Sequence, residues 1–273
     1  MKSAELCEAL RSGKRVYGTL IVSSSPEWPQ HVKHLDLDFV FIDTEHVAIG
    51  RETLAWICQA YQSLEITPLV RIPTSDPYLA SIALDAGAGG IIAPYVEKPE
   101  QVQKLRGAIK YRPIKGVKSR DILDGKVDAL EPELASYLNT RNQAAMLVNI
   151  ESVAAIRALD EILCVPGLDA VLIGPHDLSC SMGIPEAYDH PDFDHAVRTI
   201  LKKARDAGVG AGIHYSGDDI DQEISWIKEG GANLIIHSAD IISFIKCMRE
   251  DIHKIKGALG DDIIPTSADN LFI

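Results

Sequence analysis

The sequence lacks the cysteine spacing of a disulfide framework or a thiolate zinc site. It has five cysteines, at positions 7, 58, 164, 180 and 247, and no Cys-x-x-Cys pair. An odd number of cysteines without paired spacing supports neither a set of disulfides nor a structural zinc ion. We therefore expect five reduced thiols that serve mainly as packing groups.

Basic residues and long apolar runs are also scarce. The chain has 27 Lys and Arg against 39 Asp and Glu, a formal net charge of -12, which would repel a nucleic-acid backbone. No apolar run approaches the ~20 residues that span a bilayer. Residues 1–8 contain acids and lack the apolar core of a signal peptide. We expect a cytoplasmic protein that binds neither nucleic acid nor membranes.

Short apolar runs rich in Val, Ile and Leu recur along the chain instead. Eight of them are predicted to be strands: Val16 to Val22, Leu37 to Glu45, Thr67 to Ile72, Gly89 to Val96, Ala144 to Glu151, Leu168 to Gly174, Val209 to Tyr215 and Ala232 to Ser238. Their near-continuous apolarity is typical of parallel strands that are covered on both faces.

Amphipathic segments with helical spacing lie between these runs. They are Arg51 to Gln62, Pro77 to Ala86, Pro99 to Ile109, Val153 to Leu163, His195 to Ala207, Asp219 to Glu229 and Ile241 to Ile255. Ser152 and Asp76 precede two of them in the position of N-caps. This alternation predicts an α/β fold, a single (β/α)8 TIM barrel over residues 1–273, with 257–273 as a C-terminal tail of unassigned role. Residues 111–143 form the longest stretch between strands and are expected to cover the active face.

Carboxylates follow two neighbouring strands where each strand ends. The active site of such a barrel is built at the carboxyl ends of the strands. Glu151 ends the fifth apolar run, and Asp177 follows the sixth. Because neighbouring strands lie about 4.8 Å apart, the two carboxylates can share one hard cation, for which Mg²⁺ or Mn²⁺ fits better than structural Zn²⁺. The alternative is that each carboxylate only caps the helix or turn that follows it.

Two other ionisable side chains lie at the same predicted rim. Arg71 ends the third run, where its planar guanidinium could bind a carboxylate through two hydrogen bonds or form a surface ion pair. His46 follows the second run and could act as a general base or be a structural residue. The sixth run ends without a lysine, which argues against a Schiff-base aldolase.

Six segments together resemble the HpcH/HpaI aldolase family, the metal-dependent pyruvate aldolases that act on 2-oxo-3-deoxy-aldarates and related acids. They are Phe41 to His46, Val70-Arg71, Leu84 to Ala88, Ile92 to Pro94, Asn149 to Glu151 and Ile173 to Ser179. They occur in order and with compatible spacing between about residues 4 and 256. The Asp-x-Glu-His and Gly-Pro-x-Asp-Leu-Ser segments carry most of the specificity.

The resemblance implies a role for each matching residue. Glu151 and Asp177 would bind a divalent cation, Mg²⁺ or Mn²⁺, with Co²⁺ also possible. Arg71 would hold oxygens of pyruvate, and His46 would belong to the acid/base apparatus. Asp85 matches an aspartate that pairs with this histidine across a subunit interface, which implies a homo-oligomer, a trimer-based hexamer.

The implied substrate site includes backbone and amide groups beside the carboxylates, and Gly174, Pro175 and Asn149 are expected to line it. The implied reaction cleaves a 4-hydroxy-2-oxo acid into pyruvate and an aldehyde. In it the cation acts as a Lewis acid and stabilises the enolate of pyruvate.

The chain departs from the family at residues 112–119, where Lys118 replaces an arginine and so lacks the bidentate fork. Asn149 stands where a glutamine is common. Two other functions stay open. One is a CoA-thioester lyase of the citrate lyase beta-subunit type, although no basic cluster for the CoA phosphates is obvious. The other is a catalytically lapsed barrel that acts as an oligomeric binding protein.

Overall fold

Eight parallel strands close into one barrel in the computed structural model of the chain, which describes residues 1–127, 130–217 and 219–263. The strands are β1 (Val16–Ile21), β2 (Phe39–Asp43), β3 (Thr67–Arg71), β4 (Gly90–Ala93), β5 (Ala145–Asn149), β6 (Ala170–Ile173), β7 (Gly210–Tyr215) and β8 (Leu234–Ala239). Each strand pairs with the next one along the chain, and β8 pairs with β1. The predicted (β/α)8 barrel is confirmed.

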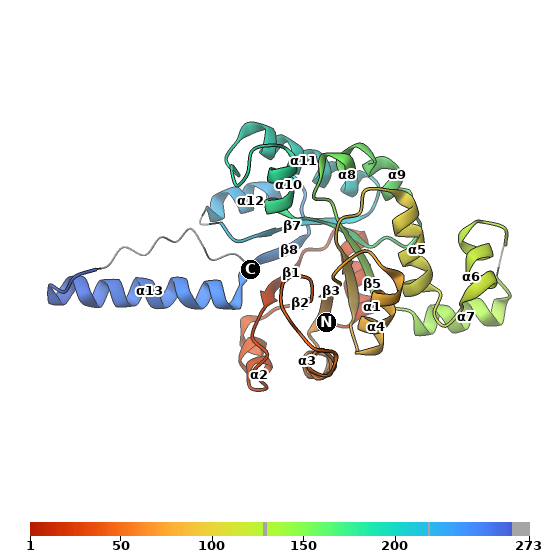
Figure 1. The fold of residues 1–273 in the computed structure, drawn as a ribbon, viewed down its shortest axis with the longest axis horizontal. Coiled ribbons are helices and arrows are strands. Elements are labelled where there is room, and N and C mark those ends of the chain that lie inside the picture. Colours follow the sequence, from red (N-terminus) through yellow and green to blue (C-terminus); the bar gives the residue numbers. More distant parts are fainter. Residues whose placement is uncertain (128–129, 218, 264–273) are drawn as a thin grey trace.

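Helices surround the barrel (Figure 1). They are α1 (Ser3–Ser12), α2 (Trp28–Val32), α3 (Arg51–Ser63), α4 (Pro77–Asp85), α5 (Pro99–Lys110), α6 (Gly116–Leu123), α7 (Pro132–Arg141), α8 (Val153–Arg157), α9 (Leu159–Leu163), α10 (Pro175–Ser181), α11 (Pro191–Asp206), α12 (Ile220–Lys228) and α13 (Asp240–Leu259), with a 3-10 turn η1 (Lys33–Leu35). The short helices α2, α6 and α10 were not predicted.

Both predicted N-caps form. Ser152 Oγ accepts a hydrogen bond from the backbone N–H of Ala155 at 3.0 Å, and Asp76 Oδ1 accepts one from Tyr78 at 2.7 Å. The helix predicted over Val153 to Leu163 is wrong as a single unit, because it breaks at Ala158 into α8 and α9. The helix predicted from His195 begins earlier, at Pro191.

The barrel is closed at one end by α1. Leu6 and Leu10 of this helix are fully buried and belong to the same apolar cluster as Phe39, Leu147 and Leu234, which point into the barrel. Because α1 covers the end where the strands begin, substrate access is left to the opposite end, where the strands finish.

Residues 111–143 do not cover the active face, and that expectation was wrong. They connect the end of α5 to the start of β5, so they lie on the side where strands begin. They contain α6 and α7, which extend from the side of the barrel (Figure 1). Near the end of this segment, Asn142 Nδ2 donates hydrogen bonds to the carbonyl oxygens of Lys110 and Arg112 at 3.0 and 2.7 Å.

The last helix, α13, projects away from the barrel (Figure 1). None of its residues is buried, although it carries an apolar stripe with helical spacing. The stripe consists of Ile241, Phe244, Met248, Ile252, Ile255 and Leu259, each at least 38% exposed. The outward-facing side chains Tyr17 of β1 and His237 of β8 are also exposed, so no helix of the described residues covers the barrel wall between these strands.

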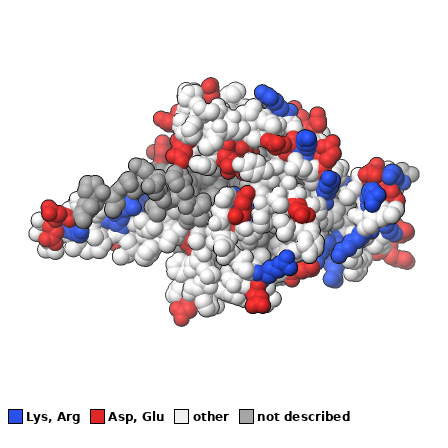
Figure 2. All heavy atoms as spheres, viewed as in Figure 1, with Lys and Arg blue, Asp and Glu red and all other residues white. Residues whose placement is uncertain are grey.

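The first residues of the predicted 257–273 tail belong to α13, which continues past the predicted end at Ile255; residues 264–273 lie outside the described part. Among the described helices, none is long and apolar enough to cross a bilayer. On the face in Figure 2, acidic side chains are spread over the molecule. Lys and Arg are mixed with them, most densely over α5, α6 and α7.

Gly212 of β7 tests the packing inside the barrel. A Cβ at this position would overlap the backbone carbonyl of Leu234 in β8. We expect Gly212→Ala to lower the free energy of unfolding by about 3 kcal/mol, because backbone atoms of a paired strand cannot move aside. Urea denaturation measures this. Gly257→Ala, in α13 with open space around it, is the control and should not destabilise. Equal stability of both variants would contradict the packing described.

Candidate active site

A cavity of about 490 Å³ opens at the carboxyl ends of the strands. Six of the predicted site residues line it: His46, Arg71, Asn149, Gly174, Pro175 and Asp177. His214, Tyr188 and Tyr215 complete its walls, and Phe41 and Leu172 form part of its floor. These six residues come from the ends of four different strands, β2, β3, β5 and β6.

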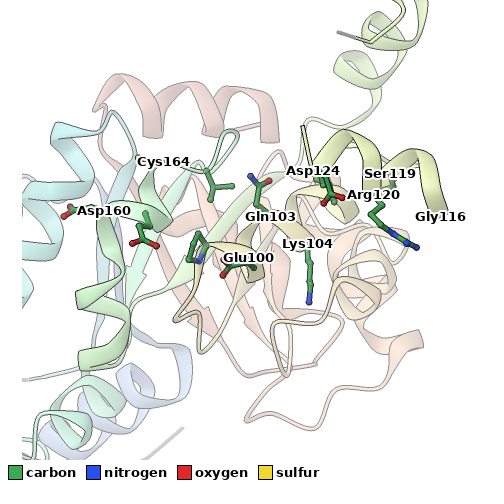
Figure 3. A pocket seen from close by; sticks show the side chains of 13 residues that line it. Glu100, Gln103, Lys104, Gly116, Ser119, Arg120, Asp124, Asp160 and Cys164 are labelled. Atoms are coloured by element: carbon green, nitrogen blue, oxygen red, sulfur yellow. The ribbon is translucent and has the colours of Figure 1, made fainter. Parts of the chain in front are cut away.

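A larger cavity, of about 1020 Å³, lies on the outside of the barrel between α5, α6 and α9 (Figure 3). Its lining includes Gln103, Arg120 and Asp160 and none of the predicted site residues. No strand end contributes to it, so we place the chemistry at the barrel mouth.

Arg71 is held by a carboxylate from the neighbouring strand. Asp43 and Arg71 are register partners in β2 and β3. Arg71 Nε and Nη2 donate to the two oxygens of Asp43 at 2.9 and 2.6 Å. Burial alone would raise the pKa of Asp43, but the hydrogen bonds and charge of Arg71 outweigh burial and hold that pKa below its usual range. Arg71 is 9% exposed, so it is not part of a surface ion pair.

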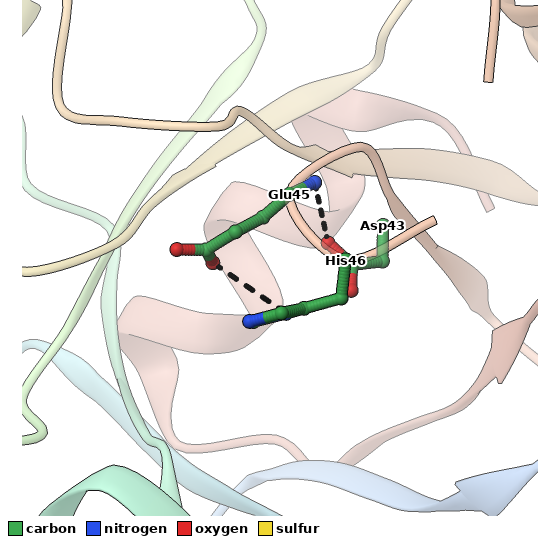
Figure 4. A group of neighbouring side chains, drawn as sticks. All are labelled: Asp43, Glu45 and His46. Carbon is green, nitrogen blue, oxygen red and sulfur yellow. Dashed lines mark hydrogen bonds and ion pairs between the residues drawn. The ribbon is translucent and has the colours of Figure 1, made fainter. Parts of the chain in front are cut away.

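Glu45 and His46 extend this cluster toward solvent (Figure 4). Arg71 Nε lies 3.2 Å from Glu45 Oε2, and Nη2 lies 2.7 Å from Nδ1 of His46. Since arginine can only donate, His46 Nδ1 accepts, and a neutral His46 ring carries its proton on Nε2. Among the described residues, Arg71 Nη1 has no hydrogen-bond partner, and the guanidinium lines the cavity.

Asp43, Glu45 and His46 offer three metal-ligand atoms within 4.8 Å of one another. The guanidinium of Arg71 already lies among these atoms, and its charge balances one of the two carboxylates. A cation placed there would have to approach a fixed positive charge at close range, which is unfavourable at low dielectric. This cluster therefore fits an anion-binding arginine better than a metal ion.

Glu151 has a different environment. It is 2% exposed and forms no ion pair with the described residues. Its Oε1 accepts the backbone N–H of Tyr95 at 2.7 Å, and its Oε2 accepts from Asn149 Nδ2 at 2.8 Å. Burial raises the pKa of Glu151 to about 7 in spite of these hydrogen bonds. Since Ser152 caps α8, the alternative that Glu151 is only a helix cap is excluded.

Asp177 lies in the first turn of α10, beside Glu151. Its Oδ1 accepts a hydrogen bond from the hydroxyl of Tyr95 at 2.9 Å, so one tyrosine contacts both predicted metal ligands. Gly174, three residues earlier, brings the two segments together. A Cβ there would stand 2.5 Å from Glu151 Oε2, which only a glycine avoids without a shift. The hydroxyl donation to Asp177 is the main reason why the pKa of Tyr95 is raised to about 12.

The oxygen atoms here fit a hard divalent cation. Glu151 and Asp177 supply carboxylates, and the amide oxygen of Asn149 is buried without a hydrogen-bond partner among the described residues. Carboxylate and amide oxygens are the ligands that Mg²⁺ and Mn²⁺ prefer. A buried carboxylate without an ion pair and an unpaired amide oxygen are both costly, and a cation would relieve both costs.

No catalytic or binding role was predicted for His214 or Tyr95. His214 is half-buried in β7, its Nε2 donates to the carbonyl of Ser238 at 3.0 Å, and its ring meets Phe41 edge-on. Burial lowers the pKa of His214 to about 4, so the ring is neutral near pH 7. Tyr95 follows β4 as Glu151 follows β5. The strand-end rule applied to the fourth strand would have found it.

Asp85 is the predicted residue that a single chain does not bring to the site. It ends α4 and is 70% exposed, and its carboxylate is hydrogen-bonded to Arg112. Because α4 runs back along the barrel, its last residue lies near the end where strands begin, opposite His46. Lys118 is also away from the cavity, on α6, where it pairs with Glu131 at 3.3 Å.

The sequence pattern of the HpcH/HpaI aldolase/citrate lyase family matches residues 17–241. The chain belongs to this family. That range contains every predicted site residue.

Two relatives with similar sequences are named as aldolases. The chain is 30% identical over 247 residues to a hydroxypyruvate/pyruvate aldolase of Roseovarius nubinhibens, covering 90% of this chain and 94% of that protein. It is 28% identical to the 2-keto-3-deoxy-L-rhamnonate aldolase of Escherichia coli, covering 91% and 92%. These relatives confirm the resemblance and support the expectation of a carbon-carbon lyase.

Solved structures agree with this relationship. An HpcH/HpaI aldolase from Desulfitobacterium hafniense superposes with a TM-score of 0.77 at 27% identity, covering 91% of this chain and 95% of that one. The citrate synthase SbnG superposes with a TM-score of 0.78 at 28% identity, covering 94% and 99%. The family thus also contains an enzyme named for carbon-carbon bond formation.

His214 should make stability depend on pH. Its pKa is near 4 when folded and about 6.5 when unfolded, so between these values the unfolded chain binds more protons and stability falls as pH falls. Between pH 7.5 and pH 5, wild type should lose about 2 kcal/mol more than His214→Gln, in which an amide can still donate to Ser238. Urea unfolding at both pH values measures this. His34→Gln, at an exposed position, should behave as wild type; an equal loss in His214→Gln would contradict the assignment.

Proposed function

We propose that this protein is a divalent-metal-dependent aldolase that cleaves a 4-hydroxy-2-oxo acid to pyruvate and an aldehyde. The observation that carries the proposal is the buried carboxylate of Glu151, which forms no ion pair with the described residues and lies beside Asp177 at the barrel mouth. The aldolase relatives at 28–30% identity over most of the chain support the same reaction class.

Glu151 and Asp177 would hold the cation, with the oxygen of Asn149 or a water beside it. When bound, Mg²⁺ or Mn²⁺ would supply a Lewis acid for the carbonyl oxygen of the oxo acid. We favour this pair over Asp43, Glu45 and His46, because the guanidinium of Arg71 already forms ion pairs with both carboxylates of that second cluster. We propose Mg²⁺ or Mn²⁺ as the physiological cation, and Co²⁺ also fits an oxygen ligand set of this kind.

Arg71 would bind the carboxylate or carbonyl oxygens of pyruvate. Asp43 fixes its guanidinium from one side, which leaves Nη1 directed at the cavity. A fixed positive charge near the oxo group favours the build-up of negative charge during carbon-carbon cleavage. The side chain needs no reorganisation for this, because two hydrogen bonds already hold it.

His46 would move the proton of the aldol hydroxyl. Its side chain is 51% exposed at the rim, and its Nδ1 accepts from Arg71, which directs Nε2 toward incoming substrate or water. Gly174 and Pro175 would form the wall against which pyruvate lies. The apolar floor of Phe41 and Leu172 excludes water below the reacting carbons.

A CoA-thioester lyase is less well supported. The citrate lyase beta subunit superposes at 17% identity with a TM-score of 0.53, a likeness that concerns the fold alone. A lapsed binding protein would not need to keep Glu151 buried without a counter-charge, since that arrangement lowers stability. Free thiols at all five cysteines agree with a cytoplasmic location, which we include in the proposal.

We further propose a homo-oligomer, a trimer-based hexamer, in which Asp85 of a neighbouring copy reaches His46. Within one chain Asp85 lies at the opposite end of the barrel, so such pairing requires a second copy. The exposed apolar stripe of α13 and the uncovered wall between β8 and β1 both call for a partner surface. A second copy of the chain offers both surfaces at once.

Removal of the ligands or the metal should abolish catalysis. Glu151→Gln and Asp177→Asn keep shape and remove charge, so each should lower pyruvate release at least 100-fold, and EDTA should do the same to wild type. A lactate-dehydrogenase-coupled assay with 4-hydroxy-2-oxo acids, followed by Mn²⁺ or Mg²⁺ add-back, measures this. Glu100→Gln, an exposed carboxylate on α5, is the matched control.

Near-normal turnover in Glu151→Gln or Asp177→Asn would contradict their role as ligands. Activity that survives EDTA and is trapped by borohydride would instead indicate a lysine mechanism. Mn²⁺ binding without cleavage of any oxo acid would favour the lapsed-barrel alternative.

We expect the proposed homo-oligomer to depend on the apolar stripe of α13. Phe244→Glu combined with Ile252→Glu places charges in the apolar stripe and should convert the oligomer to smaller species by sedimentation velocity. Pyruvate release should fall with it, because Asp85 would no longer reach a neighbouring His46. Glu250→Lys on the opposite face of α13 should change neither. A fully active monomer would contradict the shared site.

A further inference from the structure

Tyr95 has a backbone conformation that its residue type rarely adopts. It follows β4 with φ at +50°, in the left-handed region. Bulky residues other than glycine seldom occupy this region, and they do so only where the surrounding structure imposes it. Such residues cluster at functional sites, which makes the reason for this one worth finding in its contacts.

The loop around Tyr95 is pinned by one glutamine. Gln101 Oε1 accepts the backbone N–H groups of Glu97 and Lys98 at 2.9 and 3.0 Å. Its Nε2 donates to the carbonyl of Tyr95 at 3.2 Å and to Ser75 Oγ at 3.0 Å. These bonds hold the peptide units that follow the left-handed residue, and Gln101 makes them without contacting either carboxylate.

The left-handed turn aims two donors of the same residue at two carboxylates. The backbone N–H points to Glu151 Oε1 at 2.7 Å, and the phenol reaches across the rim to Asp177 Oδ1 at 2.9 Å. Each carboxylate thereby has one oxygen held by Tyr95. With a right-handed φ, the N–H and the side chain would point in other directions, and one of the two contacts would be lost.

We propose that Tyr95 is a positioning residue for the cation, which orients Glu151 and Asp177 so that they can coordinate one ion together. The inference rests on the proposed function, because it assumes that these two carboxylates are the ligands. Asn149 Nδ2 donates a hydrogen bond to the other oxygen of Glu151, Oε2, at 2.8 Å and so also helps to orient this carboxylate. Groups that hydrogen-bond to metal ligands fix the orientation of those ligands and raise metal affinity.

A mutation can remove the contact of the Tyr95 hydroxyl with Asp177 without changing the backbone contact with Glu151. Tyr95→Phe keeps the ring and the backbone N–H to Glu151 and removes only the hydroxyl that holds Asp177. We expect Mn²⁺ to bind roughly 10-fold more weakly, the low end of what loss of such a partner produces. Tyr95→Asn, which tolerates the left-handed conformation, also lacks the phenol and should weaken Mn²⁺ binding by a similar factor.

The experiment is titration of the purified protein with Mn²⁺, with the free ion followed by electron paramagnetic resonance, so that no turnover is needed. Tyr78→Phe is the matched control, an exposed tyrosine on α4 at 66% exposure whose loss should leave Mn²⁺ affinity unchanged. Thermal melting in EDTA accompanies each titration. A positioning role predicts weaker Mn²⁺ binding with an unchanged melting temperature in EDTA.

The outcomes separate the two proposals. If wild type binds Mn²⁺ and Tyr95→Phe binds it equally well, the role of Tyr95 is overturned and the metal site stands. If Tyr95→Phe melts lower in EDTA and loses affinity only in proportion to unfolding, the residue is merely structural and the inference fails. If wild type binds no Mn²⁺, or Glu151→Gln and Asp177→Asn bind it as wild type does, the proposed function itself fails.

Discussion

A buried carboxylate that forms no ion pair with the described residues is the constraint on which the proposed active site depends. Glu151 is 2% exposed, and burial raises its pKa to about 7 although two hydrogen bonds favour the charged form. The barrel could have avoided this arrangement with an apolar residue at the end of β5. The position of the Glu151 carboxylate beside Asp177 and the unpaired amide oxygen of Asn149 is explained if a cation binds to these oxygens and balances their charge.

The barrel mouth has two pairs of acidic residues, and the neighbours of each pair suit it to a different proposed task. Asp43 and Glu45 hold the guanidinium of Arg71, which is the proposed binding group for the anionic end of the substrate. Glu151 and Asp177 are hydrogen-bonded to one tyrosine instead of an arginine, so no fixed positive charge lies between them and a cation. An oxo acid has both an anionic carboxylate and a polarisable carbonyl, so the two sites match the two ends of one substrate.

The sequence predicted the parts of this structure that local pattern determines. Continuous apolarity located the strands, Ser152 and Asp76 marked helix starts, and the strand-end rule located Arg71, Glu151 and Asp177. Other features depend on tertiary contacts. The break at Ala158 falls on a strong helix former, and nothing in the spacing of α13 says whether its apolar stripe packs on its own barrel or on another copy. The left-handed φ of Tyr95 is likewise imposed by contacts, because tyrosine itself disfavours it.

The most direct test of the central claim is the position of the metal itself. Anomalous scattering from a crystal soaked with Mn²⁺ and pyruvate would locate the ion independently of any activity. The account predicts a single strong peak within coordination distance of carboxylate oxygens of both Glu151 and Asp177, with pyruvate oxygens on the same ion. A peak at Asp43, Glu45 and His46, or none at the barrel mouth, would contradict it.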